Sequence, residues 1–331
     1  MELRNLGKTG LRVSTLGFGC GNVGGLIIRG TLAERERAVA RAMELGVNYF
    51  DTAPSYGDGK SEENLGQVLR ALKAPVQVGT KFRLDPPDLR DIPGAVTRSL
   101  EASLKRLGME RVDLFQLHNR IESARGAGAL SLGDVLGEVV PAVQKLRQQG
   151  KVGFCGITAL GETATLHQAL DAGTIDTAQV CYNLLNPSAG AAVPAGFPAQ
   201  DFGRLLDRAR ERRVGVIVIR VLAAGALSGV EARHPVAVPS VEPISTAPDY
   251  GTDVARAQRL GVLVREGYVE NLIEASIRLA VGSDAVSTVL VGYSSLEHLE
   301  AAATAVERGP LPAAALERLG ALWSDLALSR G

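Results

Sequence analysis

The sequence is poor in cysteine and carries no excess of charge of either sign. Its 331 residues include three cysteines, which are widely spaced and form no CxxC pair. A disulfide framework or a zinc site is therefore not expected, and reduced thiols fit a cytoplasmic protein. Lysine plus arginine and aspartate plus glutamate both number 36. That balance gives no electrostatic reason to expect nucleic acid or an anionic membrane as a partner.

Long hydrophobic segments are also missing. The first residues, Met1–Asn5, lack the apolar core of a signal peptide. The longest apolar run, Val214–Leu227, contains Arg220 and is too short to span a bilayer. We therefore expect a soluble, cytoplasmic protein with no membrane partner. A content of 46% hydrophobic and 22% charged residues is that of an ordinary globular chain with a large core.

Short β-type segments alternate with amphipathic helical segments along the whole chain. Helical spacing is clear between Pro93 and Leu107, where Val96, Leu100 and Leu104 recur. Parallel strands need long crossover connections, so this alternation indicates a parallel sheet. The candidate strands are Thr15–Phe18, Val47–Asp51, Val76–Lys81, Val112–His118, Val152–Ile157, Thr177–Tyr182, Val214–Ile219 and Ser287–Val291.

Eight such units fit a closed (β/α)8 TIM barrel better than a doubly wound sheet, where about six strands are usual. We predict one barrel domain over residues 1–331. The segment Leu3–Val13, with its turn Gly7–Gly10, predicts an N-terminal hairpin that closes the end opposite the catalytic face. Two loop-like stretches, Asn186–Gln200 and Gly229–Thr252, follow strands six and seven, so we expect them on the catalytic face as lids.

Two local signals refine the expected helices. Ser61 followed by Glu62 and Glu63 is typical of a helix N-cap with acidic residues in the first turn. Pro141 lies inside the helical segment 135–146 and is expected to kink or restart it, because proline cannot donate the helical hydrogen bond.

Two motifs of nucleotide-binding enzymes occur in contexts that argue against them. The loop Gly19–Gly24 matches GxGxxG, but the following helix is expected only near Thr31, whereas a Rossmann site needs the helix to begin inside the glycine turn. Gly24 is then an ordinary loop residue, and its replacement by alanine is expected to change cofactor affinity little. Tyr56 and Lys60 form a YxxxK pair, but the intervening glycines disfavour the helix that this motif requires.

Four chemically active side chains lie at or just after the ends of successive predicted strands. Asp51 closes the second strand and Tyr56 follows it, Lys81 closes the third, and His118 closes the fourth. Any one of them alone is more often a cap, a packing residue or a solvated charge. A parallel barrel brings such strand ends together at one mouth, where its active sites lie. Their joint placement therefore indicates a catalytic group.

The same segments resemble the signature of the aldo-keto reductases, and the resemblance runs from Leu6 to about Ala302. The residues that carry it are 51–57 (DTAPSYG), 61–66 (SEENLG), Thr80-Lys81, 113–118 (DLFQLH) and 150–152 (GKV). Residues 6–14, 156–158 and 289–292 are similar to the sugar dehydrogenase branch of that family, namely the bacterial L-fucose (D-threo-aldose) dehydrogenases and the plant L-galactose dehydrogenases.

The resemblance implies an NAD(P)-dependent oxidoreductase that moves a hydride between nicotinamide and an aldose or a small aldehyde or alcohol. Tyr56 would exchange the proton, Lys81 would stabilise its phenolate, Asp51 would hold the lysine, and His118 would orient the substrate oxygen. No metal is required. The resemblance also implies a set of cofactor contacts: Gly19, Cys20, Asp51, Thr158, Gln179, Ile219, Arg220, Leu222, Gly292, Ser294, Ser295 and His298.

Some of these positions depart from the family pattern. Thr158-Ala159 replaces the usual Ser-Asn pair, and Ile219 stands where many members stack a tyrosine on the nicotinamide. The last loop, Gly292–His298, has no lysine or arginine to grip a 2′-phosphate, so NAD is expected over NADP. Two alternatives stay open at this point, a cofactor-binding regulatory subunit of the same fold and a Rossmann-type dehydrogenase. The partner is a small carbonyl or sugar substrate, and the oligomeric state is open.

Overall fold

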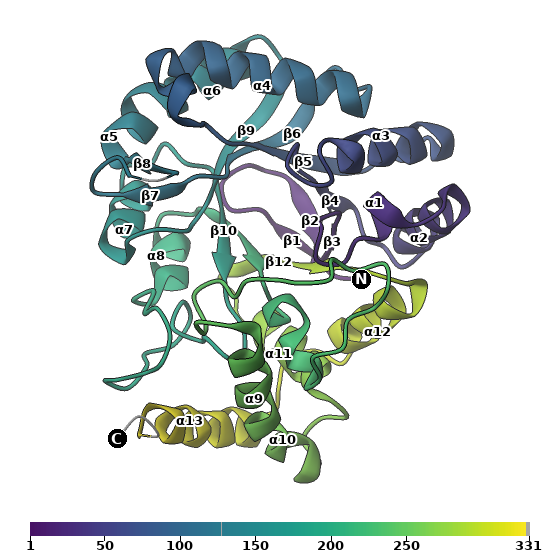
Figure 1. Cartoon of the computed structure of the whole chain (residues 1–331), viewed down its shortest axis with the longest axis vertical. Coiled ribbons are helices and arrows are strands. Elements are labelled where there is room, and N and C mark those ends of the chain that lie inside the picture. Colours follow the sequence, from purple (N-terminus) through teal and green to yellow (C-terminus); the bar gives the residue numbers. More distant parts are fainter. Residues whose placement is uncertain (127, 329–331) are drawn as a thin grey trace.

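The computed structural model describes residues 1–126 and 128–328, in which eight parallel strands form a closed barrel inside a ring of helices (Figure 1). Each predicted strand is confirmed, with its ends within two residues of the expected ones. Pairing of Val289 with Leu16 joins the last strand to the first and closes the barrel. The strands are β3 (Leu16–Gly19), β4 (Tyr49–Asp51), β5 (Gln77–Phe82), β6 (Val112–Leu117), β9 (Val152–Thr158), β10 (Thr177–Cys181), β11 (Gly215–Ile219) and β12 (Val286–Gly292).

The helices cover the barrel with apolar stripes of the expected spacing. In α4, Val96, Leu100 and Leu107 are fully buried. The longer helices are α2 (Leu32–Glu44), α3 (Lys60–Leu72), α4 (Ile92–Leu107), α6 (Val140–Gln148), α7 (Thr163–Asp171), α8 (Leu205–Glu211), α9 (Tyr250–Leu260), α11 (Leu272–Val281), α12 (Leu296–Glu307) and α13 (Ala313–Leu328). The short ones are α1 (Leu26–Arg29), η1 (Pro86–Arg90), α5 (Leu132–Asp134), η3 (Ala223–Ser228) and α10 (Val262–Arg265).

The N-terminal hairpin is confirmed as a plug at the amino ends of the barrel strands. Strands β1 (Leu3–Asn5) and β2 (Arg12–Ser14) pair antiparallel, and Leu6 and Val13 pack against Tyr49, Leu114 and Ile217 from inside the barrel. The backbone N–H of Lys8 donates to the carbonyl of Arg213 at 2.8 Å, just ahead of β11. The opposite end, where the strands finish, is therefore the open one.

The predicted N-cap at Ser61 is wrong. Helix α3 begins one residue earlier, at Lys60, after Gly59, which supplies the left-handed φ of 88° that most side chains avoid. Ser61 is fully buried instead, and its Oγ donates to the Cys20 carbonyl at 2.8 Å. Glu62 is also buried and pairs with Arg106 at 2.6 Å. Ser61 and Glu62 thus connect the helix to neighbouring segments, while Glu62 and Glu63 do lie in the first turn as expected.

The remaining local expectations hold with small changes. A π-helical turn, η2 (Val135–Val139), precedes α6, and Pro141 lies in the first turn of α6, so the helix restarts as expected. Two further short strands, β7 (Arg120–Glu122) and β8 (Ala129–Ser131), form a separate pair. The long segments after β10 and β11 have little regular structure, although residues 250–252 already belong to α9.

The segment after β11 reaches across to the loop that follows β3. Val238 N–H donates to the Asn22 carbonyl at 3.2 Å, and Arg29 Nε donates to the Val236 carbonyl at 2.5 Å. Arg233 adds bonds to the carbonyls of Val238 and Ala224 at 2.7 and 2.8 Å. The segment between η3 and α9, residues 229–249, therefore connects two sides of the mouth, and we call it the bridging segment. Among the described residues, none of the helices combines the length and apolar character that a bilayer crossing requires.

Candidate active site

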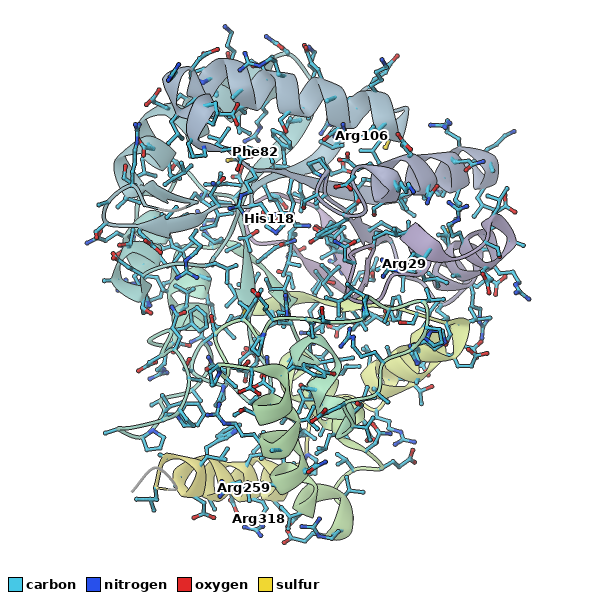
Figure 2. All side chains as sticks on the ribbon, in the orientation of Figure 1. Arg29, Phe82, Arg106, His118, Arg259 and Arg318 are labelled. Carbon is cyan, nitrogen blue, oxygen red and sulfur yellow. The ribbon has the colours of Figure 1, made fainter. Side chains whose placement is uncertain are left out.

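The barrel mouth brings the four predicted catalytic side chains together. Asp51 and Lys81, from adjacent strands, form an ion pair, and both are only 1% exposed. Lys81 Nζ also donates to the Thr52 carbonyl at 2.9 Å, and it lies 4.9 Å from the centre of the Tyr56 ring. The His118 ring stands edge-on to Tyr56, with centroids 6.1 Å apart, and Figure 2 shows His118 near the middle of the ring of strands.

A tight turn holds Tyr56 over this pair. The Tyr56 N–H donates to the Ala53 carbonyl at 3.1 Å, and Gly57, with φ of 61°, donates to Asn22 Oδ1 at 3.1 Å. A side chain at Gly57 would also meet Ile28, so the turn needs a glycine there. Tyr56 precedes α3 rather than lying on it, which removes the YxxxK interpretation.

The Asp51 carboxylate has more donors than the sequence predicted. Its Oδ1 pairs with Lys81, while its Oδ2 accepts from Gln179 Nε2 at 2.7 Å, Tyr49 OH at 3.0 Å and Gln116 Nε2 at 3.1 Å. Tyr49 and Gln116 were missed by the sequence reasoning. A signal was present, because each lies two residues before a predicted site residue and so faces the same side of its strand.

Burial and neighbouring charges fix the protonation of two members of the group. Burial alone would lower the pKa of Lys81, but the Asp51 carboxylate and Tyr56 outweigh it and raise the pKa, so the ammonium stays charged. Burial, helped by the nearby charges of Lys81 and Arg83, lowers the pKa of His118 to about 3. His118 is therefore a neutral imidazole, with one nitrogen that donates and one that accepts.

Several of the predicted cofactor residues line the ends of the barrel strands. Gly19, Thr158, Ile219 and Gly292 each end a strand, and Gln179 lies on β10 with its Oε1 3.5 Å from Thr158 Oγ1. These positions surround the Asp51–Lys81 pair.

Two other predicted contacts lie just after barrel strands. Cys20 follows β3; its thiol is 1% exposed, its Sγ lies 3.9 Å from the Phe18 carbonyl, and it is near enough to Asp51 and Lys81 for their charges to act on it. Leu222 is half-buried just after β11, at the start of η3.

Arg220 is held in an uncommon conformation beside the mouth. Its φ is 55°, in the left-handed region that is unusual for a residue other than glycine. Its carbonyl accepts from Asn183 Nδ2 at 2.8 Å, and its guanidinium donates to the Glu242 carbonyl at 3.0 Å. Burial lowers the pKa of Arg220 from its ordinary value. The side chain thus ties the end of β11 to the bridging segment.

The loop Gly19–Gly24 has a different role from the one expected. The chain passes through α1 before α2 begins after Thr31, and the barrel itself excludes a Rossmann site. A side chain at Gly24 would overlap the backbone of Gly292 and Tyr293, so Gly24 is not the ordinary loop residue that the sequence suggested. The Ser294 hydroxyl donates to the Gly24 carbonyl at 2.7 Å. The first and last loops are therefore packed directly together.

Ser295 and His298 lie at the start of α12, beside residues that the sequence did not single out. Ser295 is the residue before α12, and the exposed His298 ring lies 5.8 Å from that of His234, on the bridging segment. Arg37, on α2, is near enough to act on the charge of Glu297. His234 and Arg37 come from distant parts of the chain, so no local pattern marks them.

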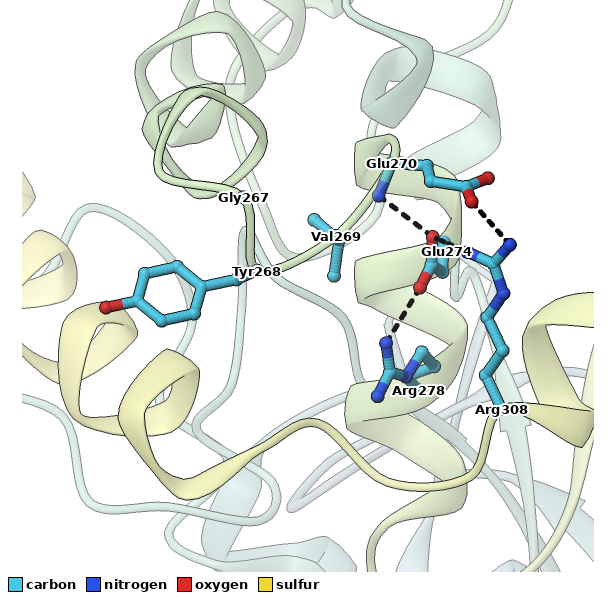
Figure 3. Close-up of a pocket in the computed structure, with 7 residues that line it drawn as sticks. All are labelled: Gly267, Tyr268, Val269, Glu270, Glu274, Arg278 and Arg308. Atoms are coloured by element: carbon cyan, nitrogen blue, oxygen red, sulfur yellow. Dashed lines mark hydrogen bonds and ion pairs between the residues drawn. The ribbon is translucent and has the colours of Figure 1, made fainter.

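A separate surface pocket does not share any of these residues (Figure 3). Glu274 accepts hydrogen bonds from Arg278 and from Arg308, both at 2.7 Å, and Arg308 also donates to Glu270 at 2.6 Å. These charges are paired with one another and connect α11 to α12, so the pocket is a structural junction. Within the described ranges, no group of three or more His, Cys, Asp or Glu side chains is arranged to hold a metal ion.

Comparison with known proteins agrees with this fold. Residues 15–324 match the model of the aldo/keto reductase family. The L-galactose dehydrogenase of Arabidopsis thaliana is 32% identical, over 92% of this chain and 88% of that protein. The D-threo-aldose 1-dehydrogenase of a Pseudomonas species is 28% identical, over 97% and 95%. An aldo-keto reductase from Bacillus halodurans, solved in its holo form, shares the fold with a TM-score of 0.72 at 24% identity, covering 97% and 96%.

The chain belongs to the aldo/keto reductase family. It is an NAD(P)-dependent oxidoreductase built as a (β/α)8 barrel, as the sequence predicted.

Proposed function

We propose that this chain, as one domain, interconverts an aldose and its oxidised product, with Asp51, Tyr56, Lys81 and His118 as the catalytic group. The observation that carries the proposal is the buried Asp51–Lys81 pair directly beneath the Tyr56 ring. The sugar follows from the names of the two dehydrogenase relatives. A bound nicotinamide supplies the hydride acceptor or donor.

The residues at the mouth suit a dinucleotide. Gln179 can donate to and accept from a primary carboxamide, which is the polar group of nicotinamide. The hydroxyl of Ser295, at the N-terminus of α12, suits a phosphate or ribose oxygen, whereas the Ser294 hydroxyl already donates to the Gly24 carbonyl. The full set of proposed cofactor contacts consists of Asp51 and the residues Gly19, Cys20, Thr158, Gln179, Ile219, Arg220, Leu222, Gly292, Ser294, Ser295 and His298.

Each of the four catalytic side chains has its own role in the transfer of a proton to or from the substrate oxygen. Tyr56 Oη gives a proton to the substrate oxygen in reduction and takes it in oxidation. A phenol releases its proton reluctantly at neutral pH, and the Lys81 ammonium stabilises the phenolate. Asp51 keeps Lys81 charged and fixed. His118, being neutral, can donate a hydrogen bond to the substrate oxygen without competing for the proton.

Replacing Tyr56 with phenylalanine tests this assignment. Turnover should fall by about 10²–10⁴, the usual contribution of a general acid–base group, while cofactor affinity stays nearly intact. Tyr268→Phe, which alters a tyrosine of the separate surface pocket, is the matched control and should behave like the wild type. Wild-type turnover in Tyr56→Phe would refute the mechanism.

A substrate screen tests the reaction itself. Aldoses and small aldehydes are incubated with NAD or NADP, or with their reduced forms, and the absorbance of the reduced nicotinamide is followed. Turnover of an aldose supports the proposal. Tight cofactor binding with negligible turnover of every compound would instead favour a regulatory subunit.

We propose further that NAD is preferred over NADP. The loop Gly292–His298 has no lysine or arginine, and Glu297 adds a negative charge where a 2′-phosphate would need a cation. His298→Arg should therefore improve the use of NADP, by about 1.5–3 kcal/mol if the new contact is charge-assisted. The measurement is kcat/KM for both cofactors. A clear NADP preference in the wild type, lost in Arg37→Met, would show that Arg37 is the missing cation.

A further inference from the structure

The Asp51 carboxylate is buried below the surface of the mouth, and protein groups occupy both of its oxygens. Lys81 takes Oδ1, and the three remaining donors, Tyr49, Gln116 and Gln179, converge on Oδ2. Gln179 also borders the proposed nicotinamide site. Tyr49, on β4, and Gln116, on β6, are also fully buried, and each donates a side-chain hydrogen bond to Asp51.

Glycines on the neighbouring strands make room for the side chains of Tyr49 and Gln116. A Cβ at Gly79, on β5, would lie 2.5 Å from the Tyr49 hydroxyl, and one at Gly156, on β9, would lie 2.7 Å from Gln116 Cγ. Glycine inside a strand weakens the strand and is typical of a close approach by another group. Two positions on the barrel strands are therefore glycine, which leaves space for Tyr49 and Gln116 to reach Asp51.

Both groups can donate a hydrogen bond to the Asp51 carboxylate. Burial, together with the Asp51 charge and the hydrogen bond to it, raises the pKa of Tyr49 well above its ordinary value, so Tyr49 remains a donor. Gln116 turns its Nε2 to Asp51, because its oxygen would repel the carboxylate.

We propose that Tyr49 and Gln116 are positioning residues of the reaction. Through Oδ2 they hold the Asp51 carboxylate turned so that Oδ1 faces Lys81, and they thereby fix the ammonium beneath Tyr56. This rests on the catalytic roles proposed above for Asp51, Lys81 and Tyr56. Neither residue touches the reacting atoms, so their effect passes through Asp51.

The test uses Tyr49→Phe and Gln116→Met, each of which removes one donor while keeping most of the volume. It is run with a sugar that the wild type oxidises and Tyr56→Phe does not, so the proposed function is established before the variants are compared. For each variant, kcat should fall about 10-fold, the order expected for one hydrogen bond to a charged group. KM, and the cofactor affinity measured by nicotinamide fluorescence, should stay near wild type.

A third variant, Gln116→Glu, separates positioning from simple packing. At low pH its carboxyl would share a proton with Asp51 and could still donate, whereas at higher pH two negative charges would face each other. Its activity relative to the wild type should therefore approach one at acidic pH and fall as pH rises. Charged and titratable groups that interact with Asp51, Tyr49 or Lys81 around this position are Tyr56, Cys20, Asp113 and His118.

Thr288→Val is the matched control, because it removes a buried hydroxyl from the barrel interior that makes no hydrogen bond within the described chain. It should keep wild-type kcat and pH dependence. Wild-type kcat and pH profiles in both Tyr49→Phe and Gln116→Met, even with a lowered Tm, would overturn the proposal and leave only a packing role. If Gln116→Met does not fold, Tyr49→Phe, which loses a single oxygen atom, decides between the two outcomes.

Discussion

Replacing Lys81 with methionine should destabilise the fold as well as stop catalysis. The change leaves the Asp51 carboxylate, which is 1% exposed, buried without its counter-ion. Removing one partner of a buried ion pair typically costs about 3–5 kcal/mol. Three hydrogen bonds to Oδ2 remain in the variant, so we expect the lower end, about 3 kcal/mol. Turnover should be lost, or the alkaline limb of its pH–rate profile should shift. A change in KM alone would contradict the role of Lys81.

A double-mutant cycle separates the uncompensated charge from lost packing. Asp51→Asn with Lys81→Met removes both charges, so the double variant should be more stable than Lys81→Met alone, with a coupling energy of about 2–3 kcal/mol. The measurement is the free energy of unfolding from urea titrations of the four proteins. Additive effects, or a loss below about 1 kcal/mol in Lys81→Met, would refute the reasoning.

The pH dependence of this stability has a definite sign. Burial opposes the charge of Lys81, but Asp51 and Tyr56 outweigh it, and the folded pKa is raised above the ordinary 10.5. A group with a raised folded pKa contributes stability that is fully present below its unfolded pKa and is lost as pH rises through the folded one. The contribution from the Lys81 charge should therefore be constant from neutral pH to about pH 10 and decline only above 10.5.

Two further predictions follow from the site. Because the pKa of His118 is lowered to about 3, its ring resonances in NMR spectra should not titrate between pH 8 and pH 5. The free energy of unfolding should fall as pH falls from about 6.5 toward 3, and the stability of His118→Gln should depend less on acid. A ring that titrates near its ordinary pKa of 6.5 would contradict this prediction. Gly24→Ala should weaken cofactor binding, because its Cβ would overlap Gly292 and Tyr293. Gly320→Ala, where a Cβ meets nothing within 4 Å, is the control in titrations of cofactor affinity, and equal affinities would contradict the packing argument.

The fold was predictable because its signals are local and repeated. Each strand is a short apolar segment between helical ones, and the catalytic side chains interrupt that pattern at strand ends, as Lys81 does after Val78 and Thr80. The hairpin was similarly marked by its glycine turn. These features depend on neighbours in sequence, so the chain itself carries them.

The parts that were missed depend on contacts between distant segments. Gly24 looks like a loop glycine until Gly292 and Tyr293 are packed against it. Ser61 has the sequence of an N-cap, but Gly59 already provides the turn, which leaves Ser61 free to bond the Cys20 carbonyl. No spacing along the chain contains this information.

The interior of the barrel has an apolar layer at its closed end and a polar layer, which contains the buried charges, toward its mouth. At the closed end, Leu6, Val13, Leu114 and Ile217 form an apolar cluster, the kind of filling that usually stabilises such a barrel. Toward the mouth, Lys81 lies opposite Gln116 and Gln116 opposite Gly156, while Gln179 lies opposite Thr158. Toward the mouth, polar side chains on adjacent strands therefore take the place of the aliphatic side chains found at the closed end. A buried ion pair is often less stabilising than apolar residues of the same volume. The placement of this polar layer around Asp51 is therefore better explained by the reaction than by folding.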